Sequence, residues 1–231
     1  MKFPELLPAV FIKRNNRFTA GVRLETGEIT TAFVPTTGRL TGALRPNCRV
    51  WLARAGDPNR KTPYTLTLAE LEHGGLCSVD ALMANRLFEE SVNNHRLKAF
   101  PYPEIDREVP YGRSRLDFRL SDGGQSCWVE VKSVTYAEDG VGKFPDAPTG
   151  RGRRHLQELA KIVREGGQSS AVFIAQRADA TTFMPFEVID PDFAETLRQV
   201  RHQGVGVHAY RCQLGLGDIE IAEEIPVVLD T

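Results

Sequence analysis

The chain has 231 residues, with 29 lysines and arginines against 30 acidic residues, and 41% of its residues are hydrophobic. This composition excludes a collagen-like, coiled-coil or wholly disordered chain. No apolar run approaches the roughly 18 to 20 residues that a membrane-spanning helix needs. The N-terminal segment reaches Lys13 and Arg14 before a signal-peptide core is complete. We therefore expect a cytoplasmic protein with no membrane partner.

Charge is distributed unevenly along the chain. Residues 1–61 contain 11 basic and 4 acidic residues, a balance of +7, so the remaining residues carry −8. A basic front on a nearly neutral chain is typical of a protein that binds a polyanion such as nucleic acid. The alternative is a solvated charged surface without a partner.

The front of the chain consists of short apolar segments separated by glycine, proline and asparagine. We expect strands at residues 9–13, 17–24, 28–34, 49–53 and 64–71. Five short strands with no intervening helix favour a small closed barrel of the OB type, although an SH3-like barrel gives a similar pattern. We assign residues 1–79 to this OB-like nucleic-acid-binding barrel.

Helical periodicity begins at Asp80, a suitable N-cap, and predicts a helix at about 80–95. The pattern then predicts strands at 107–110, 114–120 and 127–135, a helix at 153–164, a strand at 170–176, a helix at 192–203, a strand at 205–210 and a last strand within 217–231. Strands followed by alternating helices and strands indicate a mixed α/β domain over residues 80–231, so the fold class of the two-domain chain is α/β.

Two of the predicted strands each carry one acidic residue, Asp117 and Glu130, that could lie side by side. Alternation sends Trp128, Glu130 and Lys132 to one face of their strand. On the preceding strand we expect Leu116, Phe118 and Leu120 to point inward and Asp117 to point the other way. If these two strands pair, Asp117 meets Glu130.

An acid followed after about a dozen residues by acid-x-Lys is the signature of the PD-(D/E)XK nuclease fold, matched here by Asp117, Glu130 and Lys132. Carboxylate oxygens are the ligands that Mg²⁺ or Mn²⁺ prefers, and the lysine orients the attacking water. Acid-x-Lys alone is expected about once by chance in a chain of this composition, so the strand context carries the assignment. The alternative is a surface ion pair across two strands.

The whole chain also resembles the sugar fermentation stimulation protein A (SfsA) family. The matching segments are KRNNRF, PTTGRL, RKTPYTL, YGRSRLDF, VEVKSVT, FPDAPTGRGRRHLQEL, QRAD and IDPDFA. The resemblance implies an OB-like domain joined to a PD-(D/E)XK restriction-endonuclease-like domain, DNA binding and a link to sugar (maltose) metabolism. It also places Glu90 on the helical carboxylate that often completes the catalytic and metal-binding set, with Glu89 as an alternative.

Basic residues near aromatic ones are the working parts of a strand-binding groove. Arginines that open a helix after a Gly-Pro-Thr-rich loop are suited to binding phosphate. The nucleic-acid-binding candidates are Lys13, Arg14, Arg17, Arg39, Arg60, Lys61, Arg115, Arg151, Arg153, Arg154 and Gln176. Solvated arginines paired with nearby acids remain an alternative for the helix cluster, and His155 is either a proton shuttle or a structural histidine.

These patterns predict a DNA-binding protein whose rear domain hydrolyses phosphodiester bonds with Mg²⁺ or Mn²⁺. Single- and double-stranded DNA are both open as substrates, and so is a homodimer. The first alternative is a non-catalytic DNA-binding regulator that keeps a nuclease scaffold. A second alternative is an enzyme that acts on a small sugar phosphate.

Overall fold

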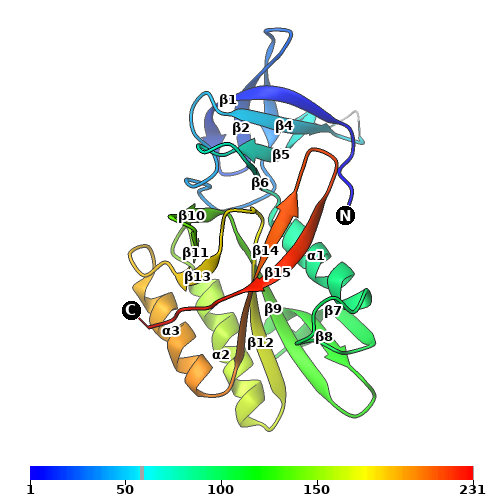
Figure 1. The fold of residues 1–231 in the computed structure, drawn as a ribbon, viewed down its shortest axis with the longest axis vertical. Coiled ribbons are helices and arrows are strands. Elements are labelled where there is room, and N and C mark those ends of the chain that lie inside the picture. The colour runs from blue at the N-terminus through cyan, green and yellow to red at the C-terminus, as the bar shows by residue number, and fades with distance from the viewer. Residues whose placement is uncertain (58–59, 231) are drawn as a thin grey trace.

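The computed structural model describes residues 1–57 and 60–230 and contains a barrel followed by a mixed α/β domain (Figure 1). The barrel strands pair in the order β3-β2-β1-β4-β5-β6, and a parallel pairing of β3 with β5 closes the barrel. Their bounds are β1 Leu6–Asn16, β2 Thr19–Leu24, β3 Ile29–Phe33, β4 Arg49–Arg54, β5 Tyr64–Glu70 and β6 Leu76–Ser78. The fold class expected from the sequence is confirmed.

Alternate side chains of a strand point to the same face, and residues two apart, such as Ala9 and Phe11 of β1 and Ala20 and Val22 of β2, belong to the buried core of the barrel. Val50 and Leu52 of β4 and Leu66 of β5 are fully buried inside the barrel. Trp51, between Val50 and Leu52, is 7% exposed and packs outside this buried cluster. Its burial therefore comes from contacts outside the barrel core.

The α/β domain is built on a sheet with the strand order β15-β14-β12-β9-β8-β7. Strands β9, β12 and β14 are parallel, and the outer pairs are antiparallel. The strands are β7 Glu104–Tyr111, β8 Ser114–Ser121, β9 Ser126–Val134, β12 Gln168–Ala175, β14 Gly206–Leu214 and β15 Ile219–Ile225. Helix α1 (Ala81–Asn93) packs on one face, while α2 (Gly150–Arg164) and α3 (Pro191–His202) cover the other (Figure 1).

Polar side chains fix where the helices begin. The Asp80 carboxylate accepts a hydrogen bond from the Leu82 amide at 2.9 Å, which confirms the predicted N-cap of α1. Helix α2 begins at Gly150, three residues before the predicted start, because the Thr149 hydroxyl accepts from the Gly152 amide at 2.9 Å. This cap holds the glycine-rich segment in helical conformation.

Three short strands form a second, small sheet that the sequence pattern does not predict. They are β10 (Tyr136–Glu138), β11 (Val141–Phe144) and β13 (Thr182–Pro185), in the order β10-β11-β13. Each has only three or four residues, too few for a period of two to be recognised. Strands β10 and β11 continue the chain from β9 to the loop before α2, whereas β13 follows β12.

Hydrogen bonds join the barrel to the α/β domain. The Arg177 guanidinium donates to the Gly42 carbonyl at 3.2 Å and to the Thr135 carbonyl at 2.9 Å, so one buried side chain links both parts. The Asp146 carboxylate accepts from the Leu40 amide at 2.8 Å. The first residues of the chain also pair with the β14–β15 turn, where the Phe3 amide donates to the Gly217 carbonyl at 2.9 Å.

The helices of residues 1–57 and 60–230 include none that is long and apolar enough to cross a membrane.

The close approach of the two parts at Gly42 can be tested by substitution. A Cβ at this position would lie 2.8 Å from the Tyr136 Cα, whereas a Cβ on Gly56 meets nothing within 4 Å. We expect Gly42→Ala to lower the free energy of unfolding by about 1 to 3 kcal/mol, because the backbone must shift. Gly56→Ala is the matched control and should be neutral or slightly stabilising. Urea denaturation measures both, and equal effects of the two substitutions would contradict the tight junction.

Candidate functional site

Strands β8 and β9 bring the two predicted carboxylates together. The strands are antiparallel, with Phe118 opposite Val129, so Asp117 and Glu130 occupy the adjoining positions. The Asp117 carboxylate accepts a hydrogen bond from the Val131 amide at 2.8 Å. The Asp117 side chain therefore binds a backbone amide of β9 just beyond Phe118 and Val129, the last backbone-paired residues of the two strands.

The three residues of β8 predicted to point inward are all buried, because Leu116, Phe118 and Leu120 are each at most 1% exposed. Leu116 packs in the cluster under α2 and α3, whereas Phe118 and Leu120 pack in the cluster under α1. The pairing of β7 with β8 skips Glu108 opposite Asp117, and Glu108 has a φ of +53°. The register is the same on both sides of this gap, and Leu116 and Phe118 contribute to different layers of the domain.

Glu130 lies deep at the base of the site, with 2% of its surface exposed. Its Oε1 accepts from Lys132 Nζ and contacts His155 Nδ1 at 2.5 Å. Burial raises the pKa of Glu130, but the charge of Lys132 and the hydrogen bond from His155 outweigh it and hold the pKa below its usual value. Glu130 Oε2 is buried and has no hydrogen-bond partner among the described residues.

The pKa of Asp117 is shifted in the opposite direction from that of Glu130. Burial and then the charge of Glu130 raise its pKa to about 6, against the opposing effects of Lys132, the Val131 amide and Asn85. Asn85 belongs to α1, so this helix contributes an amide to the site. Two carboxylates held this closely favour a bound cation, which would stabilise both ionised forms.

The two carboxylates line a cleft of about 690 Å³ between the barrel and the α/β domain. The barrel contributes Arg17 and residues 36–38, and α1 contributes Asn85. The opposite wall is the loop 144–149 with the first turn of α2, including Arg151. Arg115 of β8 also lines the cleft, and its Nε pairs with the Glu108 carboxylate at 2.6 Å.

Only three of the predicted nucleic-acid-binding residues line this cleft, namely Arg17, Arg115 and Arg151. Arg14 instead shapes its rim, because its guanidinium donates to the carbonyls of Gly38 and Arg17. The other predicted residues that lie outside the cleft lining are Lys13, Arg39, Arg60, Lys61, Arg153, Arg154 and Gln176.

Several of these outer residues have partners of their own. Arg153 pairs with Asp192, and the Arg60 guanidinium stacks 5.1 Å from the centre of the Phe33 ring. Gln176 is fully buried and donates to the Asp80 carbonyl and to the Ser133 hydroxyl, so it supports the cleft wall from behind. The alternative of arginines paired with acids holds for Arg153.

Glu90 does not join the carboxylates in the cleft. Its Oε2 pairs with the Met1 amine at 3.2 Å and with Arg96 at 3.5 Å. Glu89, the alternative, pairs with Arg107 at 3.5 Å. Asn85, one turn before Glu89 on α1, faces Asp117 instead, and the sequence carries no signal for it because a lone asparagine on an amphipathic helix is common.

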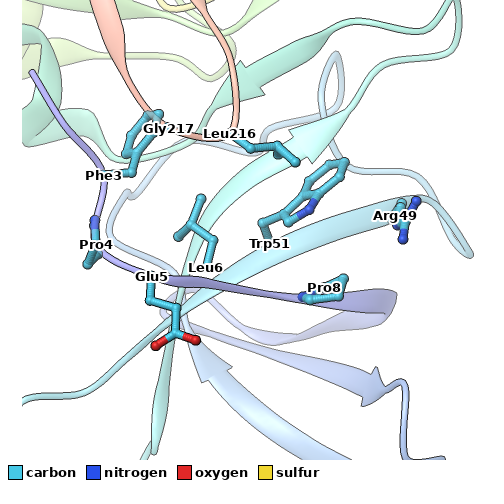
Figure 2. Close-up of a pocket in the computed structure, with 9 residues that line it drawn as sticks. All are labelled: Phe3, Pro4, Glu5, Leu6, Pro8, Arg49, Trp51, Leu216 and Gly217. Atoms are coloured by element: carbon cyan, nitrogen blue, oxygen red, sulfur yellow. The ribbon is translucent and has the colours of Figure 1, made fainter.

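A second hollow, of about 470 Å³, lies where the N-terminal segment and β4 meet the β14–β15 turn (Figure 2). Apolar side chains such as Phe3, Trp51 and Leu216 line it. Its charged residues are one acid, Glu5, and one base, Arg49. This hollow therefore lacks the pair of carboxylates that lines the first cleft.

The residues of the first cleft fit a hard divalent cation. Across residues 1–57 and 60–230, no group of three or more His, Cys, Asp or Glu side chains is arranged to hold a metal ion. Mg²⁺, however, keeps several waters and commonly binds through one or two carboxylates plus phosphate oxygens of the substrate. A buried carboxylate oxygen without a partner, beside a second carboxylate, has the chemistry of such a site.

The raised pKa of Asp117 predicts a pH-dependent stability. The pKa of Asp117 is raised from its ordinary value of 3.8 to about 6, so its ionisation lowers the free energy of unfolding. This cost grows as the pH rises from about 3.8 to about 6 and is constant above that. Without metal, Asp117→Asn should therefore be more stable than the parent at pH 8 by on the order of 2 kcal/mol, with most of the gain lost by pH 4. Denaturation in EDTA at pH 8, 5 and 4 measures this gain.

Asp122, in the turn between β8 and β9, is the control with the opposite sign. Hydrogen bonds from the Gln125 and Gly124 amides lower its pKa. Asp122→Asn should thus lose stability at pH 8 relative to acid pH. A pH-independent difference between the parent and Asp117→Asn would contradict the assignment of the cost to this carboxylate.

Comparison with known proteins identifies the family. Residues 12–79 match the SfsA N-terminal OB domain, and residues 82–217 match the sugar fermentation stimulation protein RE domain. A sugar fermentation stimulation protein homolog of Desulforamulus reducens is 41% identical over 98% of this chain and 94% of its own, and one of Thioalkalivibrio sulfidiphilus is 40% identical over 98% and 97%. A solved structure of Pyrococcus furiosus SfsA in complex with Ca²⁺ superimposes with a TM-score of 0.90 at 31% identity, covering 99% of this chain and 98% of that one. The chain belongs to the sugar fermentation stimulation protein (SfsA) family.

Proposed function

We propose that this chain binds DNA and hydrolyses its phosphodiester bonds with Mg²⁺ or Mn²⁺ in the cleft. The observation that carries the proposal is Glu130 Oε2, a buried carboxylate oxygen without a partner among the described residues. Leaving a buried charged group unpaired is costly, so such an atom is suited to a cation that binds in the working state. The complex of Pyrococcus furiosus SfsA with Ca²⁺, another hard cation with oxygen ligands, supports this choice.

The side chains of the cleft have separate roles in this proposal. Asp117 and Glu130 hold the metal, which when bound polarises the phosphoryl oxygen and neutralises its charge. Lys132, anchored on Glu130 Oε1, orients the attacking water. Arg151 and Arg115 hold the phosphate from two sides of the cleft, and Arg17 binds the strand on the barrel side.

The relatives' name adds a role in the regulation of sugar use to the proposal. Binding of DNA is common to the catalytic proposal and to a regulator without catalysis, so only cleavage separates them. A metal ion held by only two carboxylates takes its remaining ligands from water and from phosphate oxygens of the substrate. Cleavage must therefore be measured with DNA and metal together.

The catalytic roles predict which substitutions abolish cleavage. Labelled single-stranded and duplex DNA are incubated with the parent, Asp117→Ala, Lys132→Ala and Glu90→Gln, in Mg²⁺, Mn²⁺ or EDTA. We expect metal-dependent cleavage by the parent and a loss of at least about 100-fold in the Asp117 and Lys132 variants. Glu90→Gln should cleave like the parent, because Glu90 pairs with Met1 and Arg96 outside the cleft.

Two results would contradict the proposal. Undiminished cleavage by Asp117→Ala would show that the activity comes from elsewhere or from a contaminant. Salt-sensitive DNA binding by the parent without any cleavage would favour the non-catalytic regulator.

The DNA-binding role of the cleft predicts a change in salt dependence. Arg17 lines the cleft, whereas Arg201 is an exposed arginine in the last turn of α3. Arg17→Ala should weaken binding and reduce the slope of log affinity against log salt concentration by about 1, because one phosphate contact is lost. Arg201→Ala should leave the slope unchanged. Fluorescence anisotropy from 50 to 200 mM salt, a range of roughly fourfold, measures both variants; equal slopes for the parent and Arg17→Ala would contradict the contact.

A further inference from the structure

Behind the carboxylates, one histidine connects Glu130 to a cleft arginine. His155 of α2 is 3% exposed, and its Nδ1 lies 2.5 Å from Glu130 Oε1. Its other ring nitrogen, Nε2, accepts a hydrogen bond from Arg151 Nε at 3.3 Å. Arg151 and His155 are four residues apart on α2, so one helical turn brings them side by side. The three side chains form a continuous chain from the cleft to the metal site.

The hydrogen bonds that link Arg151, His155 and Glu130 can have only one assignment of donors and acceptors. An arginine guanidinium donates and never accepts, so His155 Nε2 must be the acceptor. The ring hydrogen is then on Nδ1, and His155 donates it to Glu130 Oε1. His155 therefore acts here as a neutral link, with its hydrogen directed at the carboxylate.

This arrangement determines which oxygen of Glu130 is left for a ligand. Oε1 already accepts from Lys132 and His155, while Oε2 is buried without a partner among the described residues. Second-layer hydrogen bonds of this kind orient metal ligands and tune their affinity. Arg151 donates a hydrogen bond from its Nε to His155 and lines the cleft. Because the residue is exposed, its remaining guanidinium donors are accessible to a phosphate.

We propose that His155 is a positioning residue that couples phosphate binding at Arg151 to metal binding at Glu130. The inference rests on the metal site of the proposed function and adds regulation of that site by the substrate. A phosphate that holds the Arg151 guanidinium also holds its Nε against His155, and linked hydrogen bonds polarise one another. By thermodynamic reciprocity, metal bound at Glu130 then strengthens phosphate binding at Arg151 by the same factor. Metal and substrate phosphate thus each raise the affinity of the site for the other.

The test measures Mn²⁺ affinity with and without thymidine 3′,5′-bisphosphate, a small ligand with phosphate groups and no bond between nucleotides. Free Mn²⁺ is followed by its paramagnetic resonance signal, and binding of Mn²⁺ by the bisphosphate alone is subtracted. We expect the bisphosphate to tighten Mn²⁺ binding to the parent by about tenfold, within the usual range of such couplings.

Substitutions at His155 separate coupling from metal binding. Asn at this position keeps an amide donor near Nδ1 and loses the acceptor for Arg151. His155→Asn should therefore bind Mn²⁺ within about threefold of the parent, with the bisphosphate effect reduced to about one. His155→Leu removes both links and should weaken Mn²⁺ binding by about 10- to 100-fold, the usual cost of losing such a support.

Substitutions in the first and last turns of α2 provide a test that does not disturb the buried site. Arg151→Met should lose the bisphosphate effect, because it removes both the phosphate contact and the donor to His155. Arg164→Met, an exposed arginine in the last turn of α2, is the matched control and should keep the full effect. Thermal unfolding of each variant shows whether it is folded, and either His155 variant that folds carries the test, because both lose the acceptor for Arg151.

Each failure has a different signature. If the parent binds no Mn²⁺ with or without bisphosphate, the proposed metal site is wrong and the inference falls with it. If the parent binds Mn²⁺ and folded His155→Asn keeps the tenfold effect, the metal site stands and the coupling through His155 is overturned, whatever Arg151→Met does.

Discussion

The negative charge of Glu130 is buried on the central part of the sheet, and the chemistry of the cleft depends on how that charge is compensated. A carboxylate in such a place is stable only if donors or cations approach it closely. Lys132 and His155 provide them, but both act on Oε1. Oε2 has no hydrogen-bond partner among the described residues, so it is free to bind a cation. The fold thus stabilises the charge of Glu130 while one of its oxygens stays available as a metal ligand.

The same compensation explains why two neighbouring carboxylates behave differently. Glu130 has a lowered pKa because Lys132 and His155 more than offset its burial, whereas Asp117 has a raised pKa because burial and the charge of Glu130 dominate. The site therefore holds one firmly ionised acid and one whose ionisation is costly. A divalent cation bound as proposed would remove that cost, so metal affinity and folding stability would be two consequences of one electrostatic arrangement.

Sequence reasoning recovered the parts of this arrangement that leave a periodic signal. The strands of Asp117 and Glu130, their pairing and the Asp80 cap follow from alternation and local hydrogen bonding. The gap in strand pairing at Glu108 leaves no such signal, and neither does the packing of Leu116 under α2 and α3 rather than under α1. Strands of three or four residues, such as β10, are likewise too short to show a period.

Long-range contacts explain the remaining differences. Glu90 and Asn85 lie on the same helix, and sequence alone does not say which one turns toward the cleft. The structure settles their positions through partners remote in sequence: Met1 lies 89 positions from Glu90 and contacts it, while Asn85 meets Asp117 on β8. Helical periodicity gives the buried stripe of α1, but its two flanks look alike until the neighbouring strands are in place.

The cleft itself is a product of two domains, and this limits where chemistry can occur. Asp146 holds the barrel backbone at Leu40, and Arg14 holds the carbonyls of Gly38 and Arg17, so the barrel wall is fixed relative to the loop before α2. Arg17 is thereby kept on the same cleft as the carboxylates of the other domain. A polyanion that contacts the barrel at Arg17 is then already close to Asp117 and Glu130. Under the proposed function, contact with the barrel would therefore raise the local concentration of such a polyanion at the carboxylates.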